Sequence, residues 1–139
     1  MQYLAVTLAL VFLGLSLLHG YWALGGKAGL VATLPAHASG QLVYRPPLAL
    51  VWVVAGGLLL PALLHAAYLR PGWGLTPTAW RWAEGLLAAG LLLRAVGDFR
   101  YVGLSKRVRT TLFARLDTRY YTPICLLLAG GCAVLAVVG

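Results

Sequence analysis

The sequence is poor in charge, and above all in acidic residues. Charged residues make up 10% of the 139 residues, and only three Asp and Glu stand against 11 Lys and Arg. A soluble domain usually carries about 25% charged residues, so this composition excludes an ordinary cytosolic domain. Because 61% of the residues are hydrophobic, the chain is expected to fold within a membrane. Any acid buried there needs a partner.

The sequence also lacks the usual patterns of redox and metal chemistry. Cys125 and Cys132 are seven residues apart on an expected helix, two turns from each other, so they cannot form a disulfide together. There is no Cys-x-x-Cys pair, and no spacing resembles a zinc site. His19 and His65 are expected near opposite ends of the bundle, which excludes a haem held by both. We therefore expect no metal and no cofactor.

Long apolar runs occupy most of the chain instead. Four segments are long enough to cross a membrane at about 20 residues each, and we expect helices over about 2–24, 47–69, 78–98 and 119–138. The first run has no basic segment before it and no evident cleavage site, so we expect a retained helix rather than a signal peptide. The predicted fold class is all-α, a bundle of four transmembrane helices forming a single integral membrane domain over 1–139.

The positive residues concentrate in the two long connections. Four spans place residues 25–46 and 99–121 on one side, with eight of the 11 cations, and both termini on the other. Since positive residues favour cytoplasmic loops, we expect a bacterial inner (plasma) membrane protein with both termini outside. Confinement to loops argues against nucleic acid and for anionic lipid headgroups as partners. The sequence does not decide whether the protein forms an oligomer.

A second polar region lies between the third and fourth runs. Residues 105–121 read SKRVRTTLFARLDTRYY, in which apolar side chains recur at four-residue spacing among arginines, at Val108, Leu112, Leu116 and Tyr120. This pattern predicts an amphipathic interfacial segment. Either it anchors the chain to anionic lipid, or some of its arginines fold over the pole and hold a phosphate or carboxylate.

The third run carries ionisable residues on one helical face, namely Glu84, Arg94 and Asp98. A charge inside a span costs about 2.5 to 3.5 kcal/mol, so each favours a partner or a water-lined cavity. Arg94 and Asp98 are four residues apart, and we expect a cation to hold Asp98. Glu84 is expected either as a protonated or hydrogen-bonded carboxyl beside Arg81 or as a participant in proton-coupled chemistry.

Matched depth predicts a polar site near the cytoplasmic pole. The first and third helices run in the same direction, so their ends should lie level, and surplus arginine there favours an amphipathic anion. The ligand-binding candidates are His19, Tyr21, Trp22, Arg94, Asp98, Arg100, Tyr101, Arg115, Asp117 and Tyr120. If the protein is an enzyme, the candidate acids or bases are Asp98, His19 and Glu84.

Three motifs carry a resemblance to a known family. HGYWALGG at 19–26, RAVGDFRYVG at 94–103 and FARLDTRYYTP at 113–123 are similar to the motifs of small bacterial four-helix integral membrane proteins catalogued as a domain of unknown function. The resemblance covers nearly the whole chain. It implies the four-helix membrane architecture and makes the ligand-binding candidates motif positions, but it implies no activity.

Three kinds of function agree with these observations. A ligand-binding protein or small transporter would use the polar cluster as its site for an amphipathic or anionic small molecule. A membrane enzyme would act on a lipid-like substrate, with one of the candidate acids or bases exposed in a cavity. An accessory subunit of a membrane complex would offer the bundle as a partner surface. The first is the best prediction.

Overall fold

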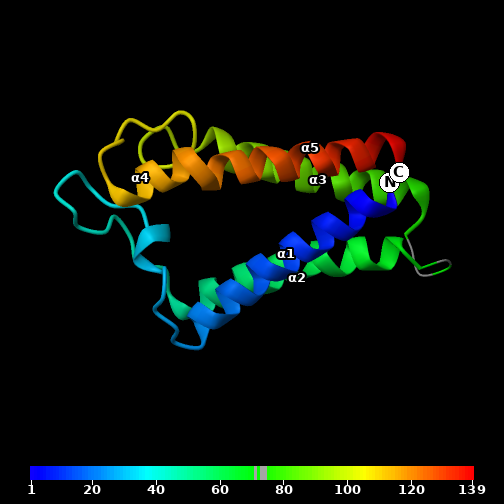
Figure 1. Ribbon diagram of the computed structural model, residues 1–139, viewed down its shortest axis with the longest axis horizontal. Coiled ribbons are helices and arrows are strands. Elements are labelled where there is room, and N and C mark those ends of the chain that lie inside the picture. Colours follow the sequence, from blue (N-terminus) through cyan, green and yellow to red (C-terminus); the bar gives the residue numbers. More distant parts are fainter. Residues whose placement is uncertain (71, 73–74) are drawn as a thin grey trace.

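Over the residues that the structure describes, the chain forms four long α-helices and one short one. The computed structural model describes residues 1–70, 72 and 75–139. The long helices are α1 (Gln2–Ala23), α2 (Leu48–Tyr68), α3 (Pro77–Val96) and α5 (Thr122–Val138), and the short one is α4 (Leu112–Leu116) (Figure 1). No strand occurs over these residues, so the predicted all-α class is confirmed.

The ends of the helices follow local signals in the sequence. The Thr76 hydroxyl accepts a hydrogen bond from the Ala79 N–H at 3.3 Å, and Pro77 occupies the first turn of α3, where no N–H is needed. Gly97 ends the same helix with a φ of 90°, which favours glycine. The first three helices therefore begin and end within two residues of the predicted spans.

The last helical stretch begins earlier than predicted and has no separate amphipathic helix before it. Residues 105–111 are not helical, and Thr111 caps α4 by accepting a hydrogen bond from the Ala114 N–H at 3.1 Å. A π-helical turn at Asp117–Tyr121 then joins α4 to α5, so that Leu112–Val138 forms one stretch of 27 residues. The expected start at residue 119 is wrong because the polar residues before it belong to the helix itself.

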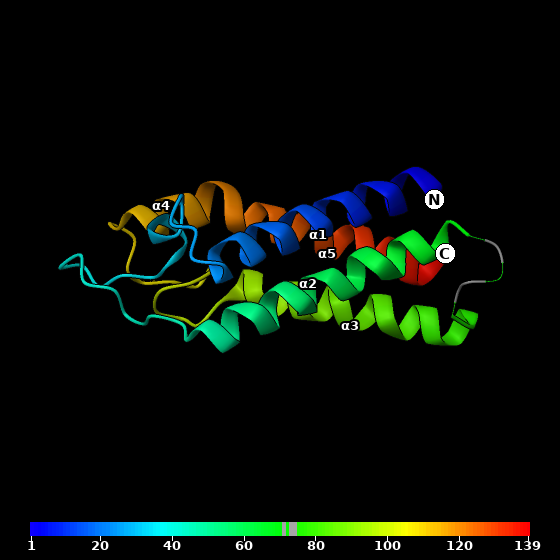
Figure 2. The same ribbon diagram turned by 90° about the horizontal axis from the view of Figure 1, so that it is seen from below.

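The helices form two antiparallel pairs. α1 lies along α2, and α3 lies along α5 (Figures 1 and 2). Figure 1 shows the two pairs closest together where both termini lie, and diverging toward the opposite end. We call the first the termini end. The opposite end, made by residues 24–47 and residues 97–121, is called the loop pole.

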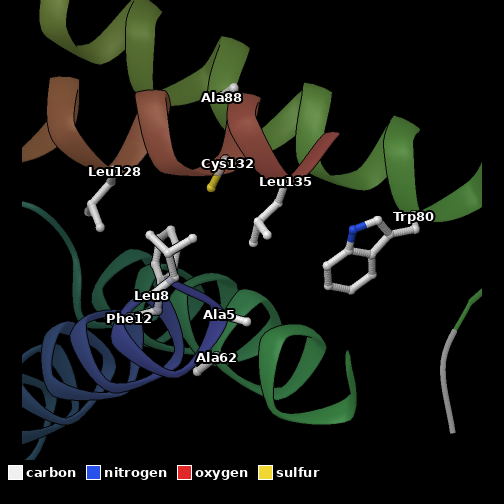
Figure 3. Packing of buried hydrophobic residues seen from close by; sticks show 9 residues of the cluster. All are labelled: Ala5, Leu8, Phe12, Ala62, Trp80, Ala88, Leu128, Cys132 and Leu135. Atoms are coloured by element: carbon white, nitrogen blue, oxygen red, sulfur yellow. The ribbon is translucent and has the colours of Figure 1, made fainter. Parts of the chain in front are cut away.

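An apolar core joins the two pairs toward the termini end. Figure 3 shows its buried side chains, contributed by all four long helices: Ala5, Leu8, Phe12, Ala62, Trp80, Ala88, Leu128, Cys132 and Leu135. Gly131 of α5 lies close to α1, since a Cβ added there would be 3.1 Å from a methyl carbon of Leu8. Small residues therefore set the spacing of α1 and α5.

Within the described residues, three helical stretches are long and apolar enough to cross a membrane. They are α1, α2 and Leu112–Val138, with mean hydropathies of 1.9, 2.1 and 2.1. Large apolar side chains on their outer faces, such as Leu10, Leu60 and Leu127, are exposed. Such a surface is unfavourable in water and suits lipid. α3 has 20 residues, three of them charged. The fold is that of a helical membrane protein.

Candidate functional site

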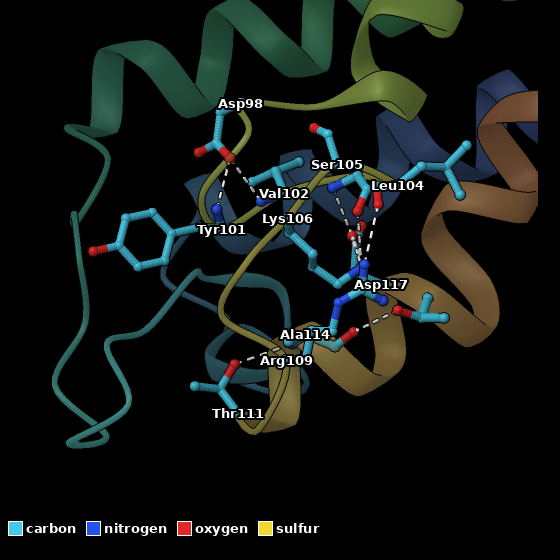
Figure 4. Close-up of polar contacts among 12 residues, drawn as sticks. Asp98, Tyr101, Val102, Leu104, Ser105, Lys106, Arg109, Thr111, Ala114 and Asp117 are labelled. Atoms are coloured by element: carbon cyan, nitrogen blue, oxygen red, sulfur yellow. Dashed lines mark hydrogen bonds and ion pairs between the residues drawn. The ribbon is translucent and has the colours of Figure 1, made fainter.

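The centre of the loop pole is a buried carboxylate, Asp117, at the start of the π-helical turn. It is fully buried and accepts three hydrogen bonds, from Arg94 at 2.8 Å, Lys106 at 3.0 Å and the Gly103 N–H at 2.8 Å. Figure 4 shows Lys106 and Asp117 directed at each other. One acid thus joins the end of α3, the following loop and the last helix, and leaves a net positive charge.

Asp98 has no such ion pair. It is exposed, and its Oδ1 accepts the backbone N–H groups of Arg100, Tyr101 and Val102 at 2.9, 2.7 and 2.9 Å. Burial raises the pKa of Asp98, but these backbone hydrogen bonds outweigh it and hold the pKa below 3.8. The expected cationic partner is wrong: Gly97 ends the helix and turns Asp98 into the loop, while Arg94 pairs with Asp117.

Two glycines make this tight loop feasible. Gly97 and Gly103 have φ angles of 90° and 79°. A Cβ on Gly97 would collide with the Val102 carbonyl, and one on Gly103 would lie 2.6 Å from the carbonyl oxygen of Val96. The close approach also lets Leu104 N–H donate to the Ala95 carbonyl at 2.8 Å, which satisfies a free carbonyl at the end of α3.

The two long connections are tied to each other. The Tyr101 hydroxyl lies 2.9 Å from Nδ1 of His37, and the Tyr121 hydroxyl donates to the Ala32 carbonyl at 3.2 Å. The Arg100 guanidinium lies over the Tyr101 ring, 5.3 Å from its centroid. Tyr101 is therefore buried as a link between the loops, whereas the Arg100 charge remains exposed.

Most cations of the loop pole are exposed. Lys106 is the exception, since it is buried against Asp117. Arg115 and Tyr120, two further candidates, are also exposed, and Arg119 lies over the Tyr120 ring at 5.4 Å. The exposed cations of the pole are Lys27, Arg45, Arg100, Arg107, Arg109, Arg115 and Arg119. They form a positive surface with Asp98 as the exposed acid.

The candidates at the end of α1 form a separate group. His19 Nδ1 lies 2.8 Å from the Leu15 carbonyl, and its ring meets the Trp22 ring edge-on at 5.0 Å. Trp22 Nε1–H donates to the Ala28 carbonyl at 2.8 Å, and Tyr21 is exposed. Among the described residues, no hydrogen bond or ion pair links this group to Arg94 or Asp98. The candidates from the end of α1 and those from the end of α3 therefore lie on different helix pairs (Figure 1).

A groove lies between the end of α1, the first connection and the start of α2. Its two adjoining hollows have volumes of about 400 and 170 Å³. Both are lined by Trp22, Leu30, Leu34, Pro46 and Val51. Lys27 and Arg45 line the larger hollow, and His19 lines the smaller. We call this the pole groove; it combines apolar walls with two exposed cations.

A third polar site lies within the apolar core. His65 of α2 and Glu84 of α3 are both fully buried, and His65 Nε2 is 3.2 Å from Glu84 Oε1. The expectation of a Glu84 carboxyl beside Arg81 is not met, because Arg81 is exposed while Glu84 faces α2. Glu84 therefore lies with the candidates of neither the loop pole nor the pole groove.

Sequence reasoning missed His65 as a site residue. α2 and α3 are consecutive and antiparallel, with His65 about one turn before the end of α2 and Glu84 about two turns after the start of α3. An ionisable residue within a span calls for a partner, and the facing helix offers His65. A search for a partner of Glu84 on the facing helix would therefore have predicted His65 from the sequence.

The fold and these polar sites define a small helical membrane protein with a folded, positively charged pole. The chain belongs to the family described as "Protein of unknown function (DUF3995)", whose model matches residues 12–132. The predicted membership of a family catalogued as a domain of unknown function is confirmed. No curated protein and no solved structure matches the chain.

Proposed function

We propose that this protein binds an amphipathic anion in the pole groove, at the cytoplasmic face of the bacterial inner membrane. The observation that carries the proposal is the groove itself, in which leucine and proline walls lie beside Lys27 and Arg45. Ligand sites typically combine apolar walls with a few polar groups that fix the orientation. His19 and Trp22, two of the predicted binding residues, line it.

The charge of the loop pole supports an anionic ligand. Eight of the 11 Lys and Arg belong to its two connections and the following helical turns. Of these eight, Lys106 is the one that forms an ion pair with a buried acid in the described part of the chain. A lysine or arginine near the surface of an anionic membrane contributes about 1 kcal/mol of attraction. A phosphate or carboxylate headgroup at Lys27 and Arg45 would gain charge-assisted hydrogen bonds as well.

The orientation in the membrane is part of the proposal. α3 is taken as a fourth span, because neither of its inner charges lies free on the outer face: Arg94 pairs with Asp117, and Glu84 is fully buried against α2. Four spans place both termini outside and the loop pole inside, as the distribution of positive residues favours. Residues 105–121 then lie at the inner interface, where their exposed arginines meet lipid headgroups.

The test is binding of dodecyl phosphate to the protein in nanodiscs of zwitterionic lipid, measured with a radiolabelled probe. The double variant Lys27→Gln, Arg45→Gln should weaken binding by about tenfold, since it removes two charge-assisted contacts. Its matched control is Arg70→Gln, Arg81→Gln, which removes the same charge from exposed residues at the other end.

The comparison of the two doubles decides the matter. Weakened binding in the Lys27/Arg45 variant alone supports a site at the groove. An equal loss in both variants would mean that the probe responds only to overall charge, and no loss in either would place it elsewhere. Val51→Phe, which fills the apolar wall without changing charge, should also weaken binding.

A further inference from the structure

The buried polar site in the core contains three potential metal ligands from three helices. His65 of α2, Glu84 of α3 and Cys132 of α5 are all fully buried. One donor atom from each lies within 4.8 Å of the others. No local spacing connects them, which is why the sequence predicted no metal site. The cluster lies away from the pole groove, and the inference does not rest on the proposed function.

The hydrogen bond of His65 to the backbone determines which of its two ring nitrogens carries the proton. Nδ1 lies 2.6 Å from the carbonyl oxygen of Pro61. A carbonyl can only accept, so Nδ1 must carry the proton. In the neutral ring, Nε2 is then an acceptor, and it lies 3.2 Å from Glu84 Oε1. An ionised carboxylate is also an acceptor, so these two atoms need either a shared proton or a metal cation between them.

No group in the described part of the chain donates a hydrogen bond to these acceptor atoms. His65 Nε2 and both carboxylate oxygens of Glu84 have no hydrogen-bond partner in the described part of the chain. The surroundings are apolar and aromatic: the Phe12 ring stacks on His65 at 5.7 Å, and the Trp80 ring meets it edge-on at 6.0 Å. Unpaired polar atoms in such a place are costly.

We propose that His65, Glu84 and Cys132 bind one divalent transition-metal ion of the Zn²⁺ type. Imidazole nitrogen, carboxylate oxygen and thiolate sulfur are the donors that Zn²⁺ takes in proteins. A histidine that binds metal almost always donates its other N–H to a carboxylate, carbonyl or water, and His65 does so to Pro61. The ligand and the group that orients it are both in place.

Charge balance favours this ion in the apolar core. Ionised Glu84 and Cys132 contribute one negative charge each, and neutral His65 contributes none, so a divalent cation makes the site neutral overall. A net charge buried among apolar side chains would be expensive. Tetrahedral Zn²⁺ needs donor atoms about 3.3 to 3.7 Å apart, so donors that lie within 4.8 Å of one another must move together by at most about 1 Å.

Such an ion would join the two helix pairs. His65 belongs to the α1/α2 pair, whereas Glu84 and Cys132 belong to the α3/α5 pair. The ion would lie within the core cluster, where Figure 3 shows Cys132 between the two helix pairs. Three protein ligands leave a fourth position on the metal for water or another donor.

Cobalt titration of the purified full chain tests the proposal. The protein is prepared without a polyhistidine tag, stripped with chelator and titrated with Co²⁺ in detergent, while the thiolate-to-cobalt charge-transfer band is followed. We expect the band to appear with one equivalent of Co²⁺ and to be displaced by Zn²⁺. Glu84→Gln and His65→Gln should weaken binding by at least about tenfold.

The two cysteines supply a matched pair of variants. Cys132→Ser should abolish the charge-transfer band, and Cys125→Ser, on the same helix but outside the cluster, should leave it unchanged. Loss of the band in Cys125→Ser alone would place the metal elsewhere and overturn the proposal. Absence of the band in the wild-type protein at a large excess of Co²⁺ would also overturn it, whether or not any variant folds.

Discussion

Replacement of Asp117 by Asn should destabilise the protein by about 3 kcal/mol. The amide has the shape of the carboxylate but no charge and only one acceptor oxygen, so it cannot serve both Arg94 on one side and Lys106 with the Gly103 N–H on the other. Lys106 is only 3% exposed and would be left as an unpaired buried charge. Removing one partner of a buried ion pair costs about 3 to 5 kcal/mol. The lower figure applies because the Arg94 side chain is 35% exposed and can turn to water.

The assay is unfolding in detergent followed by tryptophan fluorescence, with Asp98→Asn as the matched control. At position 98 the amide oxygen can still accept the three backbone N–H groups, because Asn serves as well as Asp in such turns. The control should therefore lose less than about 1 kcal/mol. Equal losses in the two variants would refute the assignment of Asp117 as the buried anchor.

A second variant separates the stranded charge from the lost hydrogen bonds. Lys106→Met removes the buried cation, so Asp117→Asn should cost less in that background than in the wild-type protein. Residues in one ion-pair network show coupling energies of about 0.5 to 3 kcal/mol in a double-mutant cycle. A coupling energy near zero would show that Lys106 does not depend on Asp117, contrary to the geometry.

Three further predictions concern the loop pole. Gly103→Ala should cost several times more stability than Gly29→Ala, because both have positive φ but only Gly103 lies against backbone carbonyls; Gly29→Ala should cost about 1 kcal/mol, and similar melting temperatures would rule out the clash. The pKa of Asp98 is lower when folded, so its contribution to stability is present above pH 3.8 and lost as the pH falls through its folded value. Asp98→Asn should thus flatten the acid limb of unfolding, and an unchanged limb would argue against this carboxylate. A reporter that works only outside the cytoplasm should be active after Gly139 and inactive at Gly40; the reverse result would invert the orientation.

The helices could be predicted because their signals are local. Runs of apolar residues gave the lengths, and Pro77 marked the start of α3, whereas the predicted end at residue 98 overran the break at Gly97. The start of the last helical stretch could not be read in this way. Residues 112–121 mix arginine and tyrosine with apolar residues, so a hydropathy pattern separates them from α5, although the backbone continues through them.

The polar contacts depended on geometry that depth alone does not fix. Matched depth placed the end of α1 level with the end of α3, but it does not say which helices are neighbours. Because α1 pairs with α2 and α3 with α5, the partner of Arg94 comes from the last helical stretch and not from α1. Lys106, which completes that cluster, lies in a loop, where no periodic pattern predicts which side chains are buried.

Some polar residues and glycines have a clear role in folding the loop pole, whereas other polar residues have no structural role that accounts for them. Gly97, Asp98, Gly103 and Asp117 all serve the backbone of the second connection, so their presence in motifs needs no ligand to account for it. The exposed cations of the pole groove make no comparable contact. His65 and Glu84 are the opposite case, because they are buried and the described part of the chain supplies no hydrogen-bond partner for the atoms that face each other. Function is therefore best sought where polar groups are placed without being satisfied, at the groove and at the buried cluster.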